Sequence, residues 1–129
     1  MDKQKIFVVD DKDMIGKIIM ACLGRDYDCP KPVLEQMEAG DLPDLIISDI
    51  RMPDMRGDEF LHAVKSDERF RHIRMVMLSS EDSTSERIQL LQDGAEDYIV
   101  KPFNPMELKV RIEDFVPDLQ IDLNEALLL

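Results

Sequence analysis

Four short apolar runs, each followed by polar side chains, constrain the fold of this 129-residue chain more than any other feature. The runs and the residues that follow them are 6–9 before Asp10 and Asp11, 45–48 before Asp49, 75–78 before Ser79 and Ser80, and 98–100 before Lys101. Short apolar runs with polar borders are typical of strands buried on both faces, as in a parallel sheet. The sequence therefore predicts a parallel sheet whose strand ends carry three carboxylates, a hydroxyl and a lysine.

Helical patterns separate these runs. Apolar residues recur at helical spacing from about residue 14 to 23, and further helices are predicted over 33–39, from Gly57 onward, over 83–94 and over 104–117. Ser83 and Glu86 form a capping-box pattern at the start of one of these helices. A weak additional strand is predicted at 27–29, where Pro30 and Pro32 should cut it short. Alternating strands and helices predict right-handed crossovers and a single α/β domain.

The charge balance excludes several classes of function. The formal net charge is −12, which argues against a nucleic-acid-binding surface because phosphate contacts need clusters of Lys and Arg. No apolar run reaches membrane-spanning length, and the N-terminus lacks a signal-peptide pattern, so a cytoplasmic location without membrane contact is expected. Some of the negative charge should be offset by a bound cation.

The predicted edge of the sheet has the composition of a phosphoryl-transfer site. In open α/β sheets, ligands bind outside the carboxyl ends of the strands. The carboxylates of Asp10, Asp11 and Asp49 would repel one another there, and Mg²⁺, which prefers oxygen ligands, would relieve that repulsion. Asp49 is a possible nucleophile, because a carboxylate can attack phosphorus to form an aspartyl phosphate. Lys101 could then pair with one phosphoryl oxygen, and Ser79 could hydrogen-bond to another.

Each of these residues has an ordinary explanation when it is taken alone. An acidic pair at a strand end is usually a solvated turn or a helix cap, and a single lysine or serine is usually a surface or turn residue. Their joint occurrence, in this order and each at a strand end, is what favours a site. Backbone N–H groups near Arg51 and Ser80 could bind the remaining phosphoryl oxygens.

The chain resembles the response-regulator receiver domains of two-component signalling. The resemblance lies in Val8–Asp11 (VVDD), in LIISDIRMP over 45–53, in LSS over 78–80 and in GAEDYIVKPF over 94–103, and it covers about 3–115. It implies a doubly wound, five-stranded parallel sheet of flavodoxin-like order 2-1-3-4-5 with five helices. It also implies a receiver domain over 1–117, which would leave 118–129 as a tail or linker stub.

The resemblance further implies a function and roles for individual residues. Asp49 would accept a phosphoryl group from a partner sensor histidine kinase, and the domain would catalyse only its own phosphorylation and dephosphorylation. Mg²⁺ would be held by Asp11, Asp49 and the Arg51 carbonyl, with Asp10 acting through water. Phosphate contacts would come from Lys101 and Ser80, and a switch pair from Ser79 and Tyr98.

The chain departs from the family pattern in one place. The stretch between Asp11 and Asp49 is several residues shorter than usual, and the loss falls around 29–32. A shortened region around the second strand is therefore expected, which affects an edge strand and the start of the following helix. The site itself is formed by the other four strands.

The sequence disfavours three other functions. An Mg²⁺-dependent phosphatase usually has a second aspartate two residues after its nucleophile, where this chain has Arg51. A flavin-binding electron carrier would need a phosphate-binding loop after the first strand, where this chain has Asp-Asp-Lys-Asp. A phosphorylation-independent interaction domain is disfavoured because every pocket residue is present.

A dimer interface is a further possibility for the face formed by the helix at 83–94, the strand at 97–100 and the following helix. Similar receiver domains of winged-helix transcription regulators dimerise through this face. Matching positions predict pairs from Arg87 to Glu107 and from Asp97 to Arg111 across a two-fold axis. The alternative is that these are solvated charges or pairs within one chain. Phosphorylation would switch this face to control an output domain or a partner protein.

Overall fold

The protein is seen here in a computed structural model, which describes residues 6–9, 24–27, 30–50, 55–101 and 105–113. Asp10, Asp11 and Arg51 lie outside the described residues. So do the predicted helix over 14–23 and the predicted tail over 118–129. The predicted end of the last helix at 117 likewise falls beyond them.

The described strands form one five-stranded sheet, and every pair of neighbouring strands is parallel. The strand order is β2-β1-β3-β4-β5, which confirms the predicted doubly wound arrangement. The strands are β1 (Ile6–Val9), β2 (Gly24–Tyr27), β3 (Leu45–Asp49), β4 (Arg74–Ser79) and β5 (Asp97–Val100). Because neighbouring strands run in the same direction, the carboxyl ends of β3, β4 and β5 lie along one edge of the sheet.

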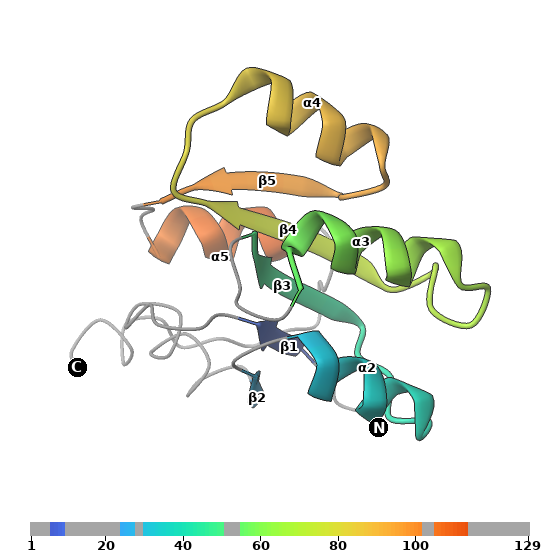
Figure 1. Cartoon of the computed structure of the whole chain (residues 1–129). Coiled ribbons are helices and arrows are strands. Elements are labelled where there is room, and N and C mark those ends of the chain that lie inside the picture. Colours follow the sequence, from blue (N-terminus) through green and yellow to red (C-terminus); the bar gives the residue numbers. More distant parts are fainter. Residues whose placement is uncertain (1–5, 10–23, 28–29, 51–54, 102–104, 114–129) are drawn as a thin grey trace.

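Alternate side chains of the strands enter two different layers of core. Phe7 of β1, Ile46 of β3 and Met77 of β4 belong to a buried cluster that also contains residues of α2 (Pro30–Glu38), α3 (Gly57–Ser66) and α4 (Thr84–Gln92). The intervening strand residues are equally buried, and α5 (Pro105–Glu113) covers the opposite face of the sheet (Figure 1). This burial on both faces explains why the strands are continuous apolar runs.

The structure corrects the predicted position of the second strand and helix. The strand ends at Tyr27 instead of occupying 27–29, and α2 begins at Pro30 instead of Val33. Proline is tolerated in the first turn of a helix, where its missing N–H would have no intrahelical acceptor. Pro30 and Pro32 therefore start the helix instead of cutting a strand. β2 has four residues, as many as β1 and β5, so the short spacing here does not remove the edge strand.

The remaining helices follow the predicted signals closely. The hydroxyl of Ser83 accepts a hydrogen bond from the backbone N–H of Glu86 at the start of α4. After α4, Gly94 has a φ of 113°, a conformation that suits glycine. Phe60, Leu61 and Val64 are fully buried on α3, as expected. Among the described residues, no helix is long and apolar enough to cross a bilayer.

Candidate functional site

Asp49 and Lys101 form an ion pair at the carboxyl edge of the sheet. Asp49 ends β3 and Lys101 follows β5, so the lysine side chain reaches past the end of β4, which lies between them. The Lys101 Nζ is 3.0 Å from the Asp49 Oδ2, and the two side chains are only 14% and 13% exposed. The Oδ1 of Asp49 accepts the backbone N–H of Ile50 at 2.8 Å. The carboxylate is thus held in one orientation with a cation beside it.

Gly57 fixes the backbone that carries Asp49. Its N–H donates to the Ile50 carbonyl at 2.7 Å. A Cβ at this position would collide with the Asp49 carbonyl oxygen and the Ile50 Cα. The start of α3 can therefore approach the end of β3 only because residue 57 is glycine. This close approach holds the end of β3 against a helix on the α2–α3–α4 face of the sheet.

Ser79 lies at the end of β4, on the same edge as Asp49 and Lys101. Its side chain is buried, and its backbone carbonyl accepts the Lys101 N–H at 2.6 Å. The Ser79 hydroxyl accepts the Glu81 N–H at 3.0 Å and donates to the Glu86 Oε1 at 3.1 Å. The structure therefore brings together three predicted site residues, Asp49, Ser79 and Lys101, at one edge. Ser80, the next residue, is exposed.

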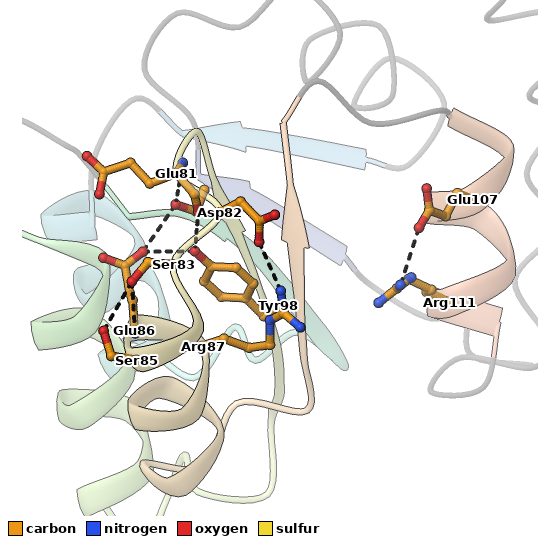
Figure 2. A network of polar contacts seen from close by, with 10 residues as sticks. Glu81, Asp82, Ser83, Ser85, Glu86, Arg87, Tyr98, Glu107 and Arg111 are labelled. Carbon is orange, nitrogen blue, oxygen red and sulfur yellow. Dashed lines mark hydrogen bonds and ion pairs between the residues drawn. The ribbon is translucent and has the colours of Figure 1, made fainter.

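Tyr98 lies inside the protein, on the same side of the sheet as α4. Its hydroxyl is 2.6 Å from the Glu81 carbonyl oxygen and 3.0 Å from the Glu86 Oε1 (Figure 2). Burial raises the pKa of the Tyr98 phenol above its usual value, and the Glu86 carboxylate acts in the same direction. Tyr98, one member of the predicted switch pair, is therefore turned inward in this structure.

Glu86 is the residue of this site that sequence reasoning missed. The capping-box pattern predicts that its side chain turns back toward Ser83, and only the Ser83 half of that box is present. The Glu86 carboxylate instead lies against Ser79 and Tyr98. Its placement seven residues after Ser79, in the first turn of a helix that contacts β5, was the available signal.

The predicted metal site includes Asp49. Asp49 is the sole predicted ligand within the described residues, and those residues contain no group of three or more potential metal ligands. β1 pairs with β3 so that Val9 lies beside Ser48. In the sequence, Val9 is followed by Asp10, and Ser48 is followed by Asp49. Carboxylates that follow neighbouring strands in this way suit a hard divalent cation.

The charged residues predicted to pair across a dimer form pairs within the chain. Arg111 contacts the Asp97 carboxylate at 2.9 Å and the Glu107 carboxylate at 3.2 Å. Arg87 pairs with Asp82 at 3.0 Å and lies over the Tyr98 ring. These contacts agree with the alternative in which the pairs are internal to one chain. Together with Leu91, residues of this face line a groove of about 400 Å³.

Comparison with known proteins identifies the family. The response regulator receiver domain family matches residues 6–113. The chain is 34% identical over 116 residues to the chemotaxis protein CheY1 of Helicobacter pylori, covering 84% of this chain and 94% of that protein. The chain therefore belongs to the response regulator receiver domain family. Domains of this family are modules of two-component signalling and not metabolic enzymes.

Other relatives place such domains within longer proteins. The chain is 32% identical over 120 residues to the sensor histidine kinase TmoS of Ectopseudomonas mendocina, covering 89% of this chain but 12% of that protein. Among solved structures, the Mn²⁺-bound form of response regulator Rcp1 has the same fold, with a TM-score of 0.70 at 19% identity, covering 92% of this chain and 97% of that one. The first of these relatives is a sensor histidine kinase that contains a region similar to this chain, and the second shows the same fold.

Proposed function

We propose that this domain accepts a phosphoryl group on Asp49 from a sensor histidine kinase. The observation that carries the proposal is the Asp49–Lys101 pair at the carboxyl edge of the sheet, with the Ser79 hydroxyl on the neighbouring strand end. A carboxylate oxygen of Asp49 attacks phosphorus, so that a new P–O bond forms as the P–N bond to the kinase histidine breaks. The Lys101 ammonium then pairs with a phosphoryl oxygen, and the Ser79 hydroxyl donates to another.

A divalent cation completes this site, and Mg²⁺ is the proposed ion. Asp49 would bind it together with Asp11 and the Arg51 carbonyl, while Asp10 acts through water. The acidic composition of the two strand ends supports the assignment, as does the Mn²⁺ bound by Rcp1, which shares the fold. When bound, the ion neutralises charge on the transferring phosphoryl group. We expect millimolar Mg²⁺ to raise the melting temperature, because it binds the folded state selectively.

Labelling with a small phosphodonor tests the assignment. Acetyl phosphate should label the protein in the presence of Mg²⁺, with acetate as the leaving group. Asp49→Asn should abolish the labelling, because an amide cannot act as the nucleophile. Asp58→Asn is the matched control, since Asp58 is a half-exposed aspartate paired with Arg56 on the surface of α3. Full labelling of the Asp49→Asn variant would contradict the proposal.

The phosphoryl group would act by changing the face formed by α4, β5 and α5. This face carries the groove beside Tyr98, and Ile88, Leu91 and Val110 are its large exposed apolar side chains. An output domain or a partner protein would bind there when Ser79 and Tyr98 move. Spectra of free and beryllofluoride-bound protein should then differ around α4 and β5, and identical spectra at saturation would contradict a switch.

A homodimer through this face is the more specific form of the proposal. The Arg111–Asp97 and Arg87–Asp82 pairs would have to open before Asp97–Arg111 and Arg87–Glu107 pairs could form across a two-fold axis. Exposed ion pairs each contribute about 0–1 kcal/mol. The free energy of exchanging the pairs within one chain for pairs between two chains is therefore close to zero and depends on salt. Sedimentation of the beryllofluoride adduct at low salt would show the dimer. A monomer at high micromolar concentration would contradict it.

A further inference from the structure

The Glu86 carboxylate has been drawn away from its own helix terminus. Glu86 is the third residue of α4, and its N–H is bound by the Ser83 hydroxyl at 3.3 Å. Its side chain extends toward Tyr98 and places Oε1 3.0 Å from the Tyr98 hydroxyl (Figure 2). The same Oε1 is 3.1 Å from the Ser79 hydroxyl. One carboxylate oxygen therefore contacts both residues of the predicted switch pair.

Two hydroxyl hydrogens lie beside two acceptors, the Glu86 Oε1 and the Glu81 carbonyl oxygen. The hydroxyls of Ser79 and Tyr98 carry one hydrogen each. The Tyr98 hydroxyl is closer to the Glu81 carbonyl oxygen, at 2.6 Å, than to Glu86. Its hydrogen is therefore mainly engaged by that carbonyl, and Oε1 depends on the hydrogen of Ser79. The Glu81 N–H, which donates to the Ser79 oxygen at 3.0 Å, favours the same hydroxyl orientation.

We propose that Glu86 is a positioning residue for Ser79, and that its carboxylate competes with a phosphoryl group on Asp49 for the Ser79 hydroxyl hydrogen. This inference rests on the proposed function, because the competitor is the group carried by Asp49. In the unphosphorylated protein, Glu86 holds the hydroxyl on the α4 side of β4. A phosphoryl group must take that hydrogen from Glu86 before Ser79 can bind it. The carboxylate thus opposes the phosphorylated conformation.

The same competition connects Ser79 to Tyr98. Once Ser79 turns to the phosphoryl group, the Tyr98 hydroxyl is the remaining hydroxyl donor beside Oε1. Its hydrogen is then shared between Glu86 and the Glu81 carbonyl, and the latter belongs to the loop between β4 and α4. A hydrogen-bond change at Ser79 therefore reaches this loop and the first turn of α4 through Glu86.

Beryllofluoride binding, with Mg²⁺ present, measures this competition directly. Glu86→Ala removes the competing acceptor and should tighten binding about three- to tenfold, the scale of one typical net hydrogen bond. Glu86→Met also removes the acceptor but keeps the length and helix propensity of the side chain, so it serves if the alanine variant folds poorly. Glu86→Gln restores an acceptor oxygen and should return the affinity toward that of the wild type.

Two controls separate competition from a general effect on charge or stability. Asp82→Ala removes one negative charge from the same loop without touching Ser79, and should leave beryllofluoride affinity unchanged. In a Ser79→Ala background, Glu86→Ala should have no effect, because the disputed hydrogen is gone. A purely structural role of Glu86 would give the same change in both backgrounds.

The outcomes distinguish this inference from the function on which it rests. If wild-type protein fails to bind beryllofluoride with Mg²⁺, the proposed function is overturned, and the inference with it. If wild-type protein binds but Glu86→Ala and Glu86→Met bind no more tightly, the inference alone is overturned. A gain of equal size in the Ser79→Ala background would also overturn it.

Discussion

Two lysine–carboxylate pairs lie at opposite edges of the sheet and differ in what surrounds them. At the carboxyl edge, Lys101 pairs with Asp49 at 3.0 Å. At the amino edge, Lys65 of α3 pairs with Glu96, the residue before β5, at 3.1 Å. The exposures are also similar, at 14% and 13% for the first pair and 15% and 25% for the second. Charge, distance and burial therefore do not distinguish the pair of the proposed phosphorylation site from the pair at the amino edge.

The two pairs differ in the parts of the sheet that they connect. The Lys65 Nζ also donates to the Ile73 carbonyl at 2.6 Å and to the Arg71 carbonyl at 3.3 Å. The Glu96 carboxylate accepts the Met75 N–H, while its own N–H donates to the Met75 carbonyl. This pair fastens the start of β4 to the start of β5. The Asp49 pair instead connects two strand ends at the edge where parallel sheets bind ligands.

Replacing each lysine by alanine should give the largest difference between the two pairs. Lys101→Ala should slow labelling by acetyl phosphate about 100-fold or more, because it removes a cation that stabilises the transferring phosphoryl group. Lys65→Ala should leave the labelling rate of the folded protein unchanged. It should instead lower the free energy of unfolding by about 2–4 kcal/mol, since it leaves Glu96 and the Ile73 carbonyl without their cation.

Urea unfolding and labelling rates, measured on the same preparations, decide the outcome. Equal loss of labelling in both variants would contradict the proposed difference between the two pairs. Equal loss of stability in Lys101→Ala and Lys65→Ala would contradict it as well.

Each pair also has a glycine beside it, and the two glycines should respond differently. Gly57→Ala places a methyl group against the Asp49 backbone, which cannot yield without moving the carboxylate. It should cost about 1–3 kcal/mol of stability and also slow labelling. Gly94→Ala places a methyl group 3.1 Å from the flexible Lys65 Cγ, at a φ of 113°. It should cost about 1–3 kcal/mol through backbone strain and leave labelling intact.

Labelling of both variants at a temperature where each is folded separates these effects. Unimpaired labelling of Gly57→Ala would show that Asp49 tolerates displacement.

The sequence predicted the parts of this fold that depend on local patterns. β4 and β5 have the predicted character because residues buried on both faces must be apolar, and a polar residue then marks each strand end. The position of β2 was wrong because Pro30 and Pro32 suit a helix start as well as a strand end. Single-sequence patterns do not decide between those two uses.

The site was predictable to the extent that strand ends determine it. Asp49, Ser79 and Lys101 meet because parallel order places their strand ends together. The direction of the Glu86 side chain was not predictable, since a capping box and a contact with the sheet require the same residue at the same position. The pairing of Arg111 with Asp97 in the same chain depends likewise on the distance between β5 and α5, which the sequence does not contain.

Alkaline pH should lower the free energy of unfolding through Tyr98, whose hydroxyl lies near the carboxyl edge. Burial raises the pKa of this phenol above 10.0, so the folded protein holds the proton more tightly than the unfolded chain. Unfolded chains then lose the proton first, and the free energy of unfolding should fall as pH rises through 10. Tyr98→Phe should show a shallower decline over the same range, and equal slopes in urea unfolding would contradict the assignment.

Acidic pH should lower the free energy of unfolding slightly through Asp67 at the amino edge, and this is the smallest of the predicted effects. Asp67 follows α3 and accepts hydrogen bonds from the Arg69 side chain at 2.7 and 3.0 Å and from its N–H at 2.9 Å. The side-chain hydrogen bond from Arg69 is the main cause that lowers the pKa of Asp67 from 3.8 to about 2. A lowered pKa contributes stability above pH 3.8, and this contribution is lost as pH falls toward 2. The contribution is small because these side chains are in contact with solvent.

Asp67→Asn keeps an acceptor for the Arg69 N–H but cannot titrate, so its stability should change less between pH 4 and pH 2 than that of the wild type. At neutral pH the variant should be labelled by acetyl phosphate at the wild-type rate, because Asp67 is at the opposite edge from Asp49. An equal acid slope in both proteins would refute the role of Asp67. A changed labelling rate would mean that the two edges are coupled, which the separate hydrogen-bond networks of Asp67 and Asp49 argue against.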